Sequence, residues 1–510
     1  MILGQSSVLH MAQVAKAGRA TVDEIFCRAA TRRPDAVALI DPPNRAAITG
    51  GVPRRLTFAE ADRMISAVAV RLRRLGLGID QVVGIQMANT VDAVVTFLGI
   101  LRAGLIAMPL PLLWRQADCV AALNRVGAKA LIVSGRIGAV DHCELAMNIA
   151  AEVFHIRQVG GFGDSLSDGV TGFDDLYAAP AGEPPPAINR AVNPAAHVAA
   201  ITWDVAPEGH VPVARSHFEL LAAGAAITLE ARVEQNAIIL NSLTLPSLAG
   251  IAVGIIPWLL IGGTLALHHP FDDEVLLQQV REEQCAVVIV PAPVALQLGE
   301  SGALRGSVKT IVAAWRAPER MAASADWNDP EVGLVDVPVF GETGVFATRR
   351  GGDGRPVPLA LGALTAPRGV SGALHVGEIA CTEAGTLGLR GPAVPKFSLP
   401  PEIDSVATPA FAVGPDGLAD TGFPCVVDAT TGALTVSGPP AGIVGVGGYR
   451  FAEQALDALA AEVAPDGRIA PQPDALAGQR LAGSAPDAAR MREGLAARGV
   501  NPLIVSAFAA

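Results

Sequence analysis

The segment that decides the fold lies at residues 56–110 and has the sequence LTFAEADRMISAVAVRLRRLGLGIDQVVGIQMANTVDAVVTFLGILRAGLIAMPL. Its first apolar residues recur at helical spacing over 57–75. Thr57 and Glu60 have the spacing of a capping box, and Gly76 is typical of the residue that follows a helix. This part therefore predicts an amphipathic helix with both ends marked.

The rest of the segment predicts a strand, a helix and a second strand. An apolar run at 82–87 comes first, Asn89 and Thr90 can cap a helix that continues to residue 103, and another apolar run occupies 105–110. Because the links between these elements are short, the alternation predicts parallel strand pairing.

The same alternation continues along the chain. We expect a helix after Asp118, strands at 130–134 and near 153–159, and a second α/β unit with a strand at 286–290. The Pro- and Ala-rich residues near 178–197 predict a surface linker between the two units.

The C-terminal part has a different pattern. Residues 351–372 are rich in Gly and Pro, and ALHVGEIACT and LTVSG alternate like short antiparallel strands. A helix is expected at 452–463. The predicted fold class is α/β, with two doubly wound α/β subdomains, a small β-rich subdomain and a shortened α+β C-terminal domain. We divide the chain into a large domain at 1–436 and a C-terminal domain at 437–510.

Composition excludes several classes of protein. The chain has 510 residues, 51% hydrophobic and 17% charged, which argues against disorder. Its net charge of −11 and scattered basic residues argue against nucleic acid as a partner. The six cysteines form no CxxC pair, so neither a zinc site nor a disulfide framework is indicated. The oligomeric state is not indicated.

One apolar segment, LAGIAVGIIPWLLIGGTLAL at 248–267, is as long as a membrane-spanning helix. Pro257 and several glycines interrupt it, and basic or aromatic flanks are missing. We interpret it as a buried helix, a glycine turn and a buried strand, and expect no membrane span. Since residues 1–13 lack the features of an export signal, we expect a cytoplasmic location.

Residues 56–110, with the Leu-Thr-aromatic start, the turn at Asn89 and the ending at Ala103-Gly104, resemble the adenylate-forming (ANL) superfamily. This family includes acyl-CoA synthetases, peptide-synthetase adenylation domains and luciferases. Its members use ATP to convert a carboxylate into an acyl-adenylate and then transfer the acyl group to CoA or another thiol. The resemblance implies ATP, Mg²⁺ and CoA as cofactors if the protein is active, and a small-molecule carboxylate or acyl group as its partner.

The family's phosphate-binding loop, rich in Ser, Thr and Gly and carrying a Lys, corresponds to residues 203–211. No hydroxyl is present there, and the Lys position is Val211. Asp204 and Glu208 would bring negative charge toward a polyanion, whereas one charge-assisted contact contributes about 1.5–3 kcal/mol. We therefore expect phosphate binding to be impaired.

Three residues are candidates to replace the missing catalytic groups. His210 or Arg215 could supply the positive charge of the Lys. Glu342 could supply a carboxylate for the metal, because the family's aromatic-Gly-x-Thr-Glu motif appears here as FGETG at 340–344 and its Glu position is Gly344. Ser216 also has a structural interpretation, since it forms a capping box with Glu219.

Other motifs are retained in part. The resemblance implies nucleotide contacts at Gly341, Thr343, Asp420 and Thr421, but Phe423 stands where the family has the Asp that holds the ribose. Trp315 and Arg316 occupy positions at which glycines let the backbone approach adenine.

The hinge and CoA region is also altered. It is represented by Gly438, Gly447 and Gly448, without the family's charged hinge residues, and no Lys follows Lys396.

These replacements leave two principal hypotheses for function. The chain is an acyl-CoA synthetase-like protein with lost or much reduced adenylation, or it is an inactive relative that binds an acyl group or CoA as a scaffolding or regulatory protein. A third possibility is a different reaction on the same fold. Whether the protein is an enzyme, and whether it needs any cofactor, is left open because fold does not establish activity.

Overall fold

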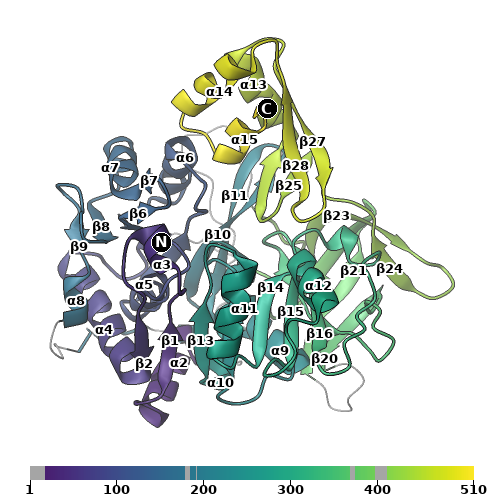
Figure 1. The fold of residues 1–510 in the computed structure, drawn as a ribbon, viewed down its shortest axis with the longest axis horizontal. Coiled ribbons are helices and arrows are strands. Elements are labelled where there is room, and N and C mark those ends of the chain that lie inside the picture. The colour runs from purple at the N-terminus through teal and green to yellow at the C-terminus, as the bar shows by residue number, and fades with distance from the viewer. Residues whose placement is uncertain are drawn as a thin grey trace.

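The computed structural model describes residues 18–178, 184–185, 187–190, 192–367, 374–396 and 411–509. Within them the strands form two large mixed sheets, a smaller antiparallel sheet, a C-terminal antiparallel sheet and a two-stranded ribbon of β6 (Arg136–Ile137) and β7 (Val140–Asp141), with helices packed against the sheets (Figure 1). The predicted α/β fold class is confirmed. The described residues between 178 and 194 form no helix or strand, and residues 1–13, where we looked for an export signal, lie outside the described part.

The first large sheet contains the predicted parallel strands. In order across the sheet its strands are β11 (Gly209–Ser216), β10 (Val198–Ala206), β4 (Ile106–Pro109), β3 (Val82–Gln86), β5 (Ala130–Ser134), β8 (Gln158–Phe162) and β9 (Thr171–Gly172). The helices of this region are α4 (Phe58–Arg74), α5 (Val91–Arg102), α6 (Gln116–Val126) and α7 (His142–Glu152).

The capping box at Thr57 is present, with the Thr57 side chain accepting from the Glu60 N–H. The prediction that the side chain of Asn89 or Thr90 caps α5 is wrong. The first N–H of that helix, at Val91, donates instead to the Asp41 carboxylate at 2.7 Å. The strand expected near 153–159 begins only at Gln158, since residue 153 ends α7 and residues 154–157 turn at the surface.

The second large sheet is mostly parallel. Its strands in order are β17 (Gly344–Val345), β16 (Gly333–Phe340), β15 (Thr310–Trp315), β14 (Val287–Pro291), β12 (Ile238–Asn241), β13 (Thr264–Leu267), β1 (Val37–Ile40) and β2 (Arg55–Thr57), with β18 (Thr348–Arg349) beside β16. The helices of this region are α2 (Val22–Arg32), α9 (His217–Glu230), α10 (Ile256–Ile261), α11 (Asp273–Glu282) and α12 (Ala292–Ser301).

The apolar segment at 248–267 folds as expected into the buried core. It forms a π-helical turn at Ala249–Val253, then α10, a turn at Gly262 with φ 62°, and the buried strand β13. The Trp258 side chain is fully buried and packs against Phe26, with ring centroids 5.9 Å apart. Among the described residues, no helix has the length and apolar character needed to cross a bilayer.

Two smaller sheets complete the molecule. The third contains β19 (Leu359–Ala360), β24 (Ala433–Val436), β23 (Ala419–Val427), β22 (Thr386–Arg390), β21 (Leu374–Cys381) and β20 (Gly362–Ala366). The fourth contains β26 (Tyr449–Ala452), β25 (Ile443–Val446), β28 (Gly478–Ser484) and β27 (Arg468–Asp474), accompanied by α13 (Glu453–Val463), α14 (Ala488–Ala497) and α15 (Pro502–Ser506). The helix expected at 452–463 is therefore found, and the sheet agrees with the predicted α+β character of this domain, although its strands were not located in the sequence.

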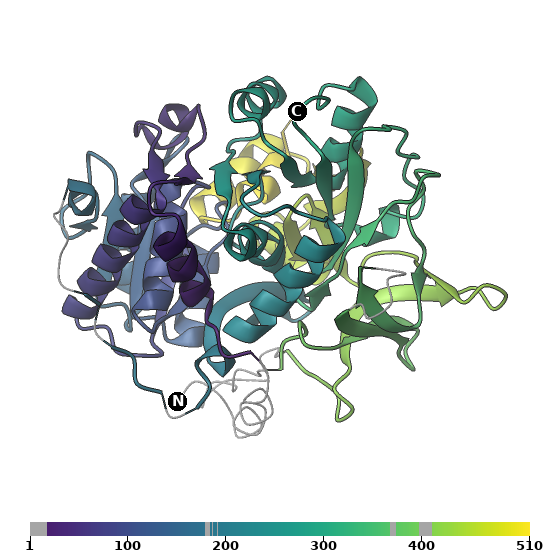
Figure 2. The same ribbon diagram turned by 90° about the horizontal axis from the view of Figure 1, so that it is seen from below.

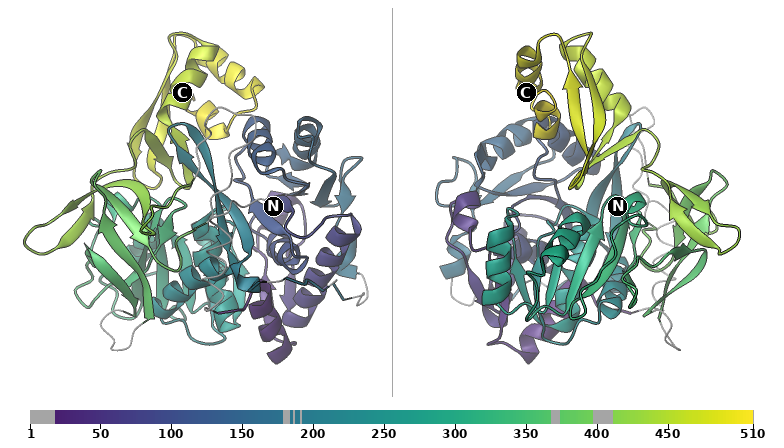
Figure 3. Two further views of the ribbon diagram at one scale, coloured as in Figure 1. Left: turned by 180° about the vertical axis from the view of Figure 1, so that it is seen from behind. Right: turned by 45° about the vertical axis from the view of Figure 1, so that its right-hand side comes forward.

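The arrangement of these units determines where a site can form. Seen from below, the second sheet lies between the first sheet and the third (Figure 2). The C-terminal sheet and its helices sit on one end of the assembly in both views of Figure 3. The chain passes from the third sheet to the fourth between Val436 and Ile443, next to the proposed boundary at 436, although the domain limits themselves stay a prediction.

Candidate functional site

The segment that corresponds to the phosphate-binding loop is a β-hairpin. Residues 203–211 belong to β10 and β11, which pair in antiparallel register with Asp204 opposite Val211 and Ala206 opposite Gly209. Our expectation of a loop is therefore wrong. Strand pairing uses backbone N–H groups that a phosphate-binding loop would direct at its ligand.

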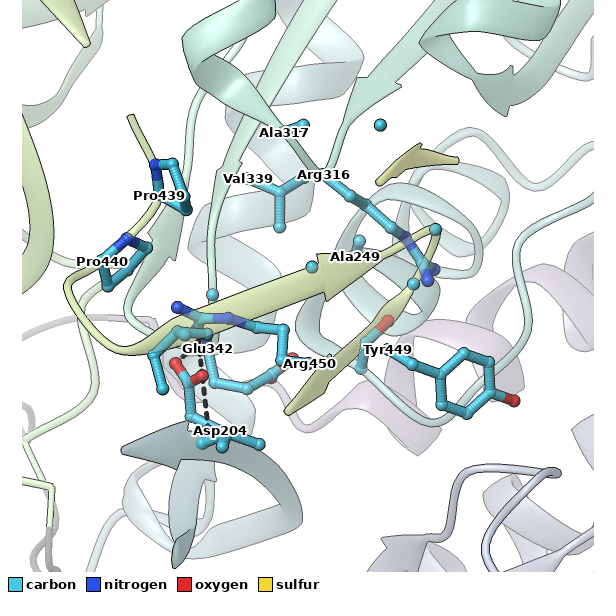
Figure 4. A pocket seen from close by; sticks show the side chains of 18 of the residues that line it. Asp204, Ala249, Arg316, Ala317, Val339, Glu342, Pro439, Pro440, Tyr449 and Arg450 are labelled. Atoms are coloured by element: carbon cyan, nitrogen blue, oxygen red, sulfur yellow. Dashed lines mark hydrogen bonds and ion pairs between the residues drawn. The ribbon is translucent and has the colours of Figure 1, made fainter. Parts of the chain in front are cut away.

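An ion pair crosses the centre of the site. The Arg450 guanidinium, from β26 of the C-terminal sheet, binds the Asp204 carboxylate on β10, and the second carboxylate oxygen accepts the Glu342 N–H at 2.7 Å (Figure 4). Gly341 lies beneath this pair with φ 54°, and a Cβ there would collide with both charged side chains. The retained glycine thus leaves room for the ion pair.

Arg215 is buried and already occupied. Its side chain is 1% exposed, and it donates to Thr202 Oγ1 at 3.2 Å and to the Glu342 carbonyl oxygen. Its Nη1 also lies 3.6 Å from Glu342 Oε2. The positive charge of Arg215 is therefore directed at Glu342 within the protein.

Glu342 faces the interior. Its Oε2 accepts the Leu248 N–H at 2.8 Å, and the residue is 6% exposed. Burial raises the pKa of Glu342 to about 7, opposed by Arg215 and by a hydrogen bond from Thr202. Because these partners occupy the carboxylate, and no group of three or more His, Cys, Asp or Glu converges within the described ranges, the arrangement does not fit a Mg²⁺ ion.

The raised pKa of Glu342 predicts a pH dependence of stability. The folded protein holds the proton of the Glu342 carboxyl more tightly than the unfolded chain does. Protonation of Glu342 therefore contributes its full stabilisation of the fold below about pH 4.5, and this stabilisation is lost as pH rises toward 7. Glu342→Gln should flatten this fall by an amount on the order of 1 kcal/mol. Urea unfolding at pH 5 and pH 7.5 measures it, and an unchanged difference between the two pH values would contradict the assignment.

His210 cannot supply the missing positive charge near neutral pH. Burial lowers its pKa to about 4, and its ring packs against Trp114 with centroids 4.6 Å apart. Thr343 is also buried, and its N–H donates to the Phe340 carbonyl oxygen at 2.9 Å. The structure does not bring either side chain together with Arg450 and Asp204.

The region that corresponds by resemblance to the family's ribose contacts is aromatic. Phe423 lies edge-on to Phe340, with centroids 5.4 Å apart, and the Arg450 guanidinium is 5.6 Å from its centroid. Thr421 Oγ1 donates to the Leu387 carbonyl at 2.6 Å, and the exposed Asp420 accepts from Thr386 Oγ1 and the Gly422 N–H. These two polar side chains are thus held within the third sheet.

The cavity beside the ion pair is small. It encloses about 90 Å³, below the roughly 300–1,000 Å³ usual for small-molecule sites. Pro439, Pro440, Gly447 and Gly448 line it, whereas Gly438 does not. The enclosed space is therefore smaller than that of a usual small-molecule site.

Sequence reasoning did not single out Arg450, and it named Arg316 only as a bulky replacement for glycine. Arg450 follows Tyr449, next to the retained glycines, but its partner Asp204 is 246 residues away, and only the fold brings them together. Trp315 and Arg316 were expected to block the purine position. In the structure Trp315 does not line this cavity, and its Nε1–H donates to Asp336 at 2.7 Å, whereas Arg316 does line it.

Comparisons with known proteins show what the chain is similar to. Residues 26–196 match the family model described as AMP-binding enzyme. Long-chain fatty acid transport protein 1 of Bos taurus is 34% identical over 121 residues, which are 24% of this chain and 18% of that protein. Cyclosporin synthetase simA of Tolypocladium inflatum is 27% identical over 188 residues, which are 37% of this chain and 1% of that protein. The chain thus matches only a small part of these curated relatives.

Solved structures extend the likeness to most of the chain. The amide bond synthetase McbA from Marinactinospora thermotolerans has a TM-score of 0.68 at 17% identity, covering 94% of each chain. The anthranilate CoA ligase AuaEII in complex with anthranoyl-AMP has a TM-score of 0.64 at 17% identity, covering 93% of this chain and 90% of that one. The chain has the fold of the adenylate-forming enzymes, and its N-terminal third matches their AMP-binding family; the resemblance inferred from the sequence is confirmed.

Proposed function

We propose that this chain is an acyl-CoA synthetase-like protein in which adenylation of a carboxylic acid is lost or much reduced. The observation that carries this proposal is the ion pair between Asp204 and Arg450, since Asp204 belongs to the segment that resembles the family's phosphate-binding loop. It supports the proposal because a nucleotide would have to separate the pair and leave a carboxylate facing its own negative charge.

The remaining side chains support the same proposal. A triphosphate needs cationic and hydroxyl donors aimed at the oxygens where charge develops. Here Arg215 is committed to Glu342, His210 is neutral near pH 7, and Val211 contributes no donor. Removing one preorganised donor commonly lowers kcat by about 10²–10³, so several losses together would abolish ordinary turnover.

The alternative is a protein that binds an acyl group or CoA without turning it over, as a scaffold or regulator. The intact apolar cores of both large sheets favour it, since the fold is preserved while the polar groups of the site are replaced. ATP, Mg²⁺ and CoA are cofactors of this chain only if it retains some adenylation activity. The cytoplasmic location stays a prediction.

Adenylation is tested by acid-dependent ATP–pyrophosphate exchange. With fatty, aryl and dicarboxylic acids as substrates, we expect no exchange above a heat-inactivated sample, and no heat of ATP binding by calorimetry in the presence of Mg²⁺. An active acyl-CoA synthetase assayed in parallel shows that the reagents work. Exchange that depends on both the acid and the native protein would overturn the proposal.

A further inference from the structure

A second cavity lies next to the site at the carboxyl edge of the second sheet. It encloses about 380 Å³, which falls within the usual range for small-molecule sites. Its walls come from the residues that follow β12, β14 and β15, closed by the turns at 447–448 and 476–478 of the C-terminal sheet. The cavity therefore lies between the large sheet and the C-terminal unit.

Its position in the topology is one where ligands commonly bind. Strand β12 pairs with β13 on one side and with β14 on the other, so the strand order reverses between β12 and β14. Open parallel sheets bind ligands outside the carboxyl ends of their strands at such a reversal. Thr244 after β12 and Val294 after β14 line the cavity on either side of it.

The lining is mostly apolar and carries cations without carboxylates. Two arginines and no Asp or Glu are found among the described residues of the wall, whose apolar members include Leu243, Phe271, Pro293, Val294, Ala314 and Leu476. A mostly apolar wall whose charged groups are all positive favours an apolar ligand that carries an anionic group.

Arg316 is the cation available to such a ligand. It directly follows β15 and lines both this cavity and the smaller one beside the ion pair. In the described part of the chain its guanidinium makes no hydrogen bond or ion pair, and it lies against Gly448, where a Cβ would collide with it (Figure 4). Arg320, by contrast, donates to the carbonyl oxygens of Asp474 and Ala475.

We propose that this cavity binds a small apolar monocarboxylate without ATP, with the carboxylate on Arg316 and the apolar body against Leu243 and Val294. The inference rests on the proposed function in one respect, namely that an acyl compound is recognised by a site that does not adenylate it. A planar guanidinium matches a carboxylate through two parallel hydrogen bonds. A phosphate monoester would bring close to two negative charges to a wall with one free cation.

The ligand class is tested by calorimetry on the full chain without ATP. The probes are octanoate and phenylacetate, their uncharged amides, and octyl phosphate. We expect at least one carboxylate to bind at least tenfold more tightly than its amide and than octyl phosphate, because the amide loses the charge-assisted contact. Equal binding of acid and amide, preferred binding of the phosphate, or no binding of either acid at millimolar concentration would overturn the proposal.

Variants locate the site. Arg316→Gln should weaken binding of the acid at least tenfold, whereas Arg355→Gln should leave it unchanged, because Arg355 is exposed and does not line the cavity. Val294→Trp fills the cavity and should also abolish binding, so the test survives if Arg316→Gln does not fold. Thermal unfolding of each variant reports folding. An Arg316→Gln or Val294→Trp protein that folds and binds the acid normally would refute the assignment.

The two proposals fail separately. Pyrophosphate exchange would refute the loss of adenylation while leaving acid binding at Arg316 to be judged from calorimetry. Absence of ATP-independent acid binding would refute the site at Arg316 and would leave the exchange result as it stands.

Discussion

Replacement of Asp336 by Ala is expected to lower the free energy of unfolding by about 3–5 kcal/mol, the cost of leaving one partner of a buried ion pair alone. Asp336 is fully buried on β16, and Arg350 reaches its two carboxylate oxygens at 2.8 and 3.1 Å. The same carboxylate accepts the Trp315 Nε1–H at 2.7 Å. Loss of the carboxylate therefore strands a buried guanidinium and a buried indole N–H together.

The measurement is the midpoint of the first urea-unfolding transition. Arg305→Ala is the matched control, because Arg305 also forms an arginine–aspartate pair, at 3.0 Å from Asp329, but its side chain is 57% exposed. A pair whose guanidinium is mostly in solvent contributes about 0–1 kcal/mol, and Asp329, 6% exposed, keeps the N–H donors of Glu331 and Val332, so this variant should stay close to the wild type. An Asp336→Ala protein no less stable than Arg305→Ala would show that the buried pair does not hold β16 and the chain after β18 together.

This buried pair illustrates what the sequence could and could not predict. Local signals were sufficient for many elements: the strand at 130–134 was predicted with its observed limits, and the capping boxes at Thr57 and Ser216 formed as their spacing indicates. Capping and periodicity depend on residues three or four positions apart, which one sequence displays. The pairing of Asp336 with Arg350 depends on how β16 and the chain after β18 pack. A single sequence does not show that packing.

The same distinction explains the errors at the candidate site. The composition of 203–211 correctly indicated that phosphate donors are missing, but the segment was expected to be a loop. Val205 and Val211 are β-branched residues that favour a strand, and they continue β10 and β11 into a hairpin. From the sequence, Arg316 was interpreted only as a bulky side chain. Its place in a cavity wall depends on turns more than 100 residues further along the chain, which local sequence patterns do not reveal.

Arg450→Ala is expected to loosen the C-terminal sheet from β10. The pair with Asp204 is mostly buried, with side chains 20% and 16% exposed, and a hydrogen bond to a charged group contributes about 1.5–3 kcal/mol. Amide hydrogen exchange in β25 and β26 should therefore quicken by tenfold or more. Arg468→Ala is the control, since Arg468 lies in the same sheet but donates only to the neighbouring carbonyls of Pro465 and Gly467.

The change should be regional, because other contacts still hold the C-terminal unit. Tyr449 Oη accepts the Leu113 N–H at 3.3 Å, and Arg320 still donates to the carbonyl oxygen of Ala475 at 2.9 Å. A double-mutant cycle of Asp204→Ala with Arg450→Ala isolates the pair, and a coupling energy of about 1.5–3 kcal/mol is expected. A coupling near zero, with exchange in 443–452 unchanged, would mean that Asp204 and Arg450 do not hold the two units together. The space beside Gly341 would then be open to a ligand at little cost, and the proposed loss of adenylation would lose its main support.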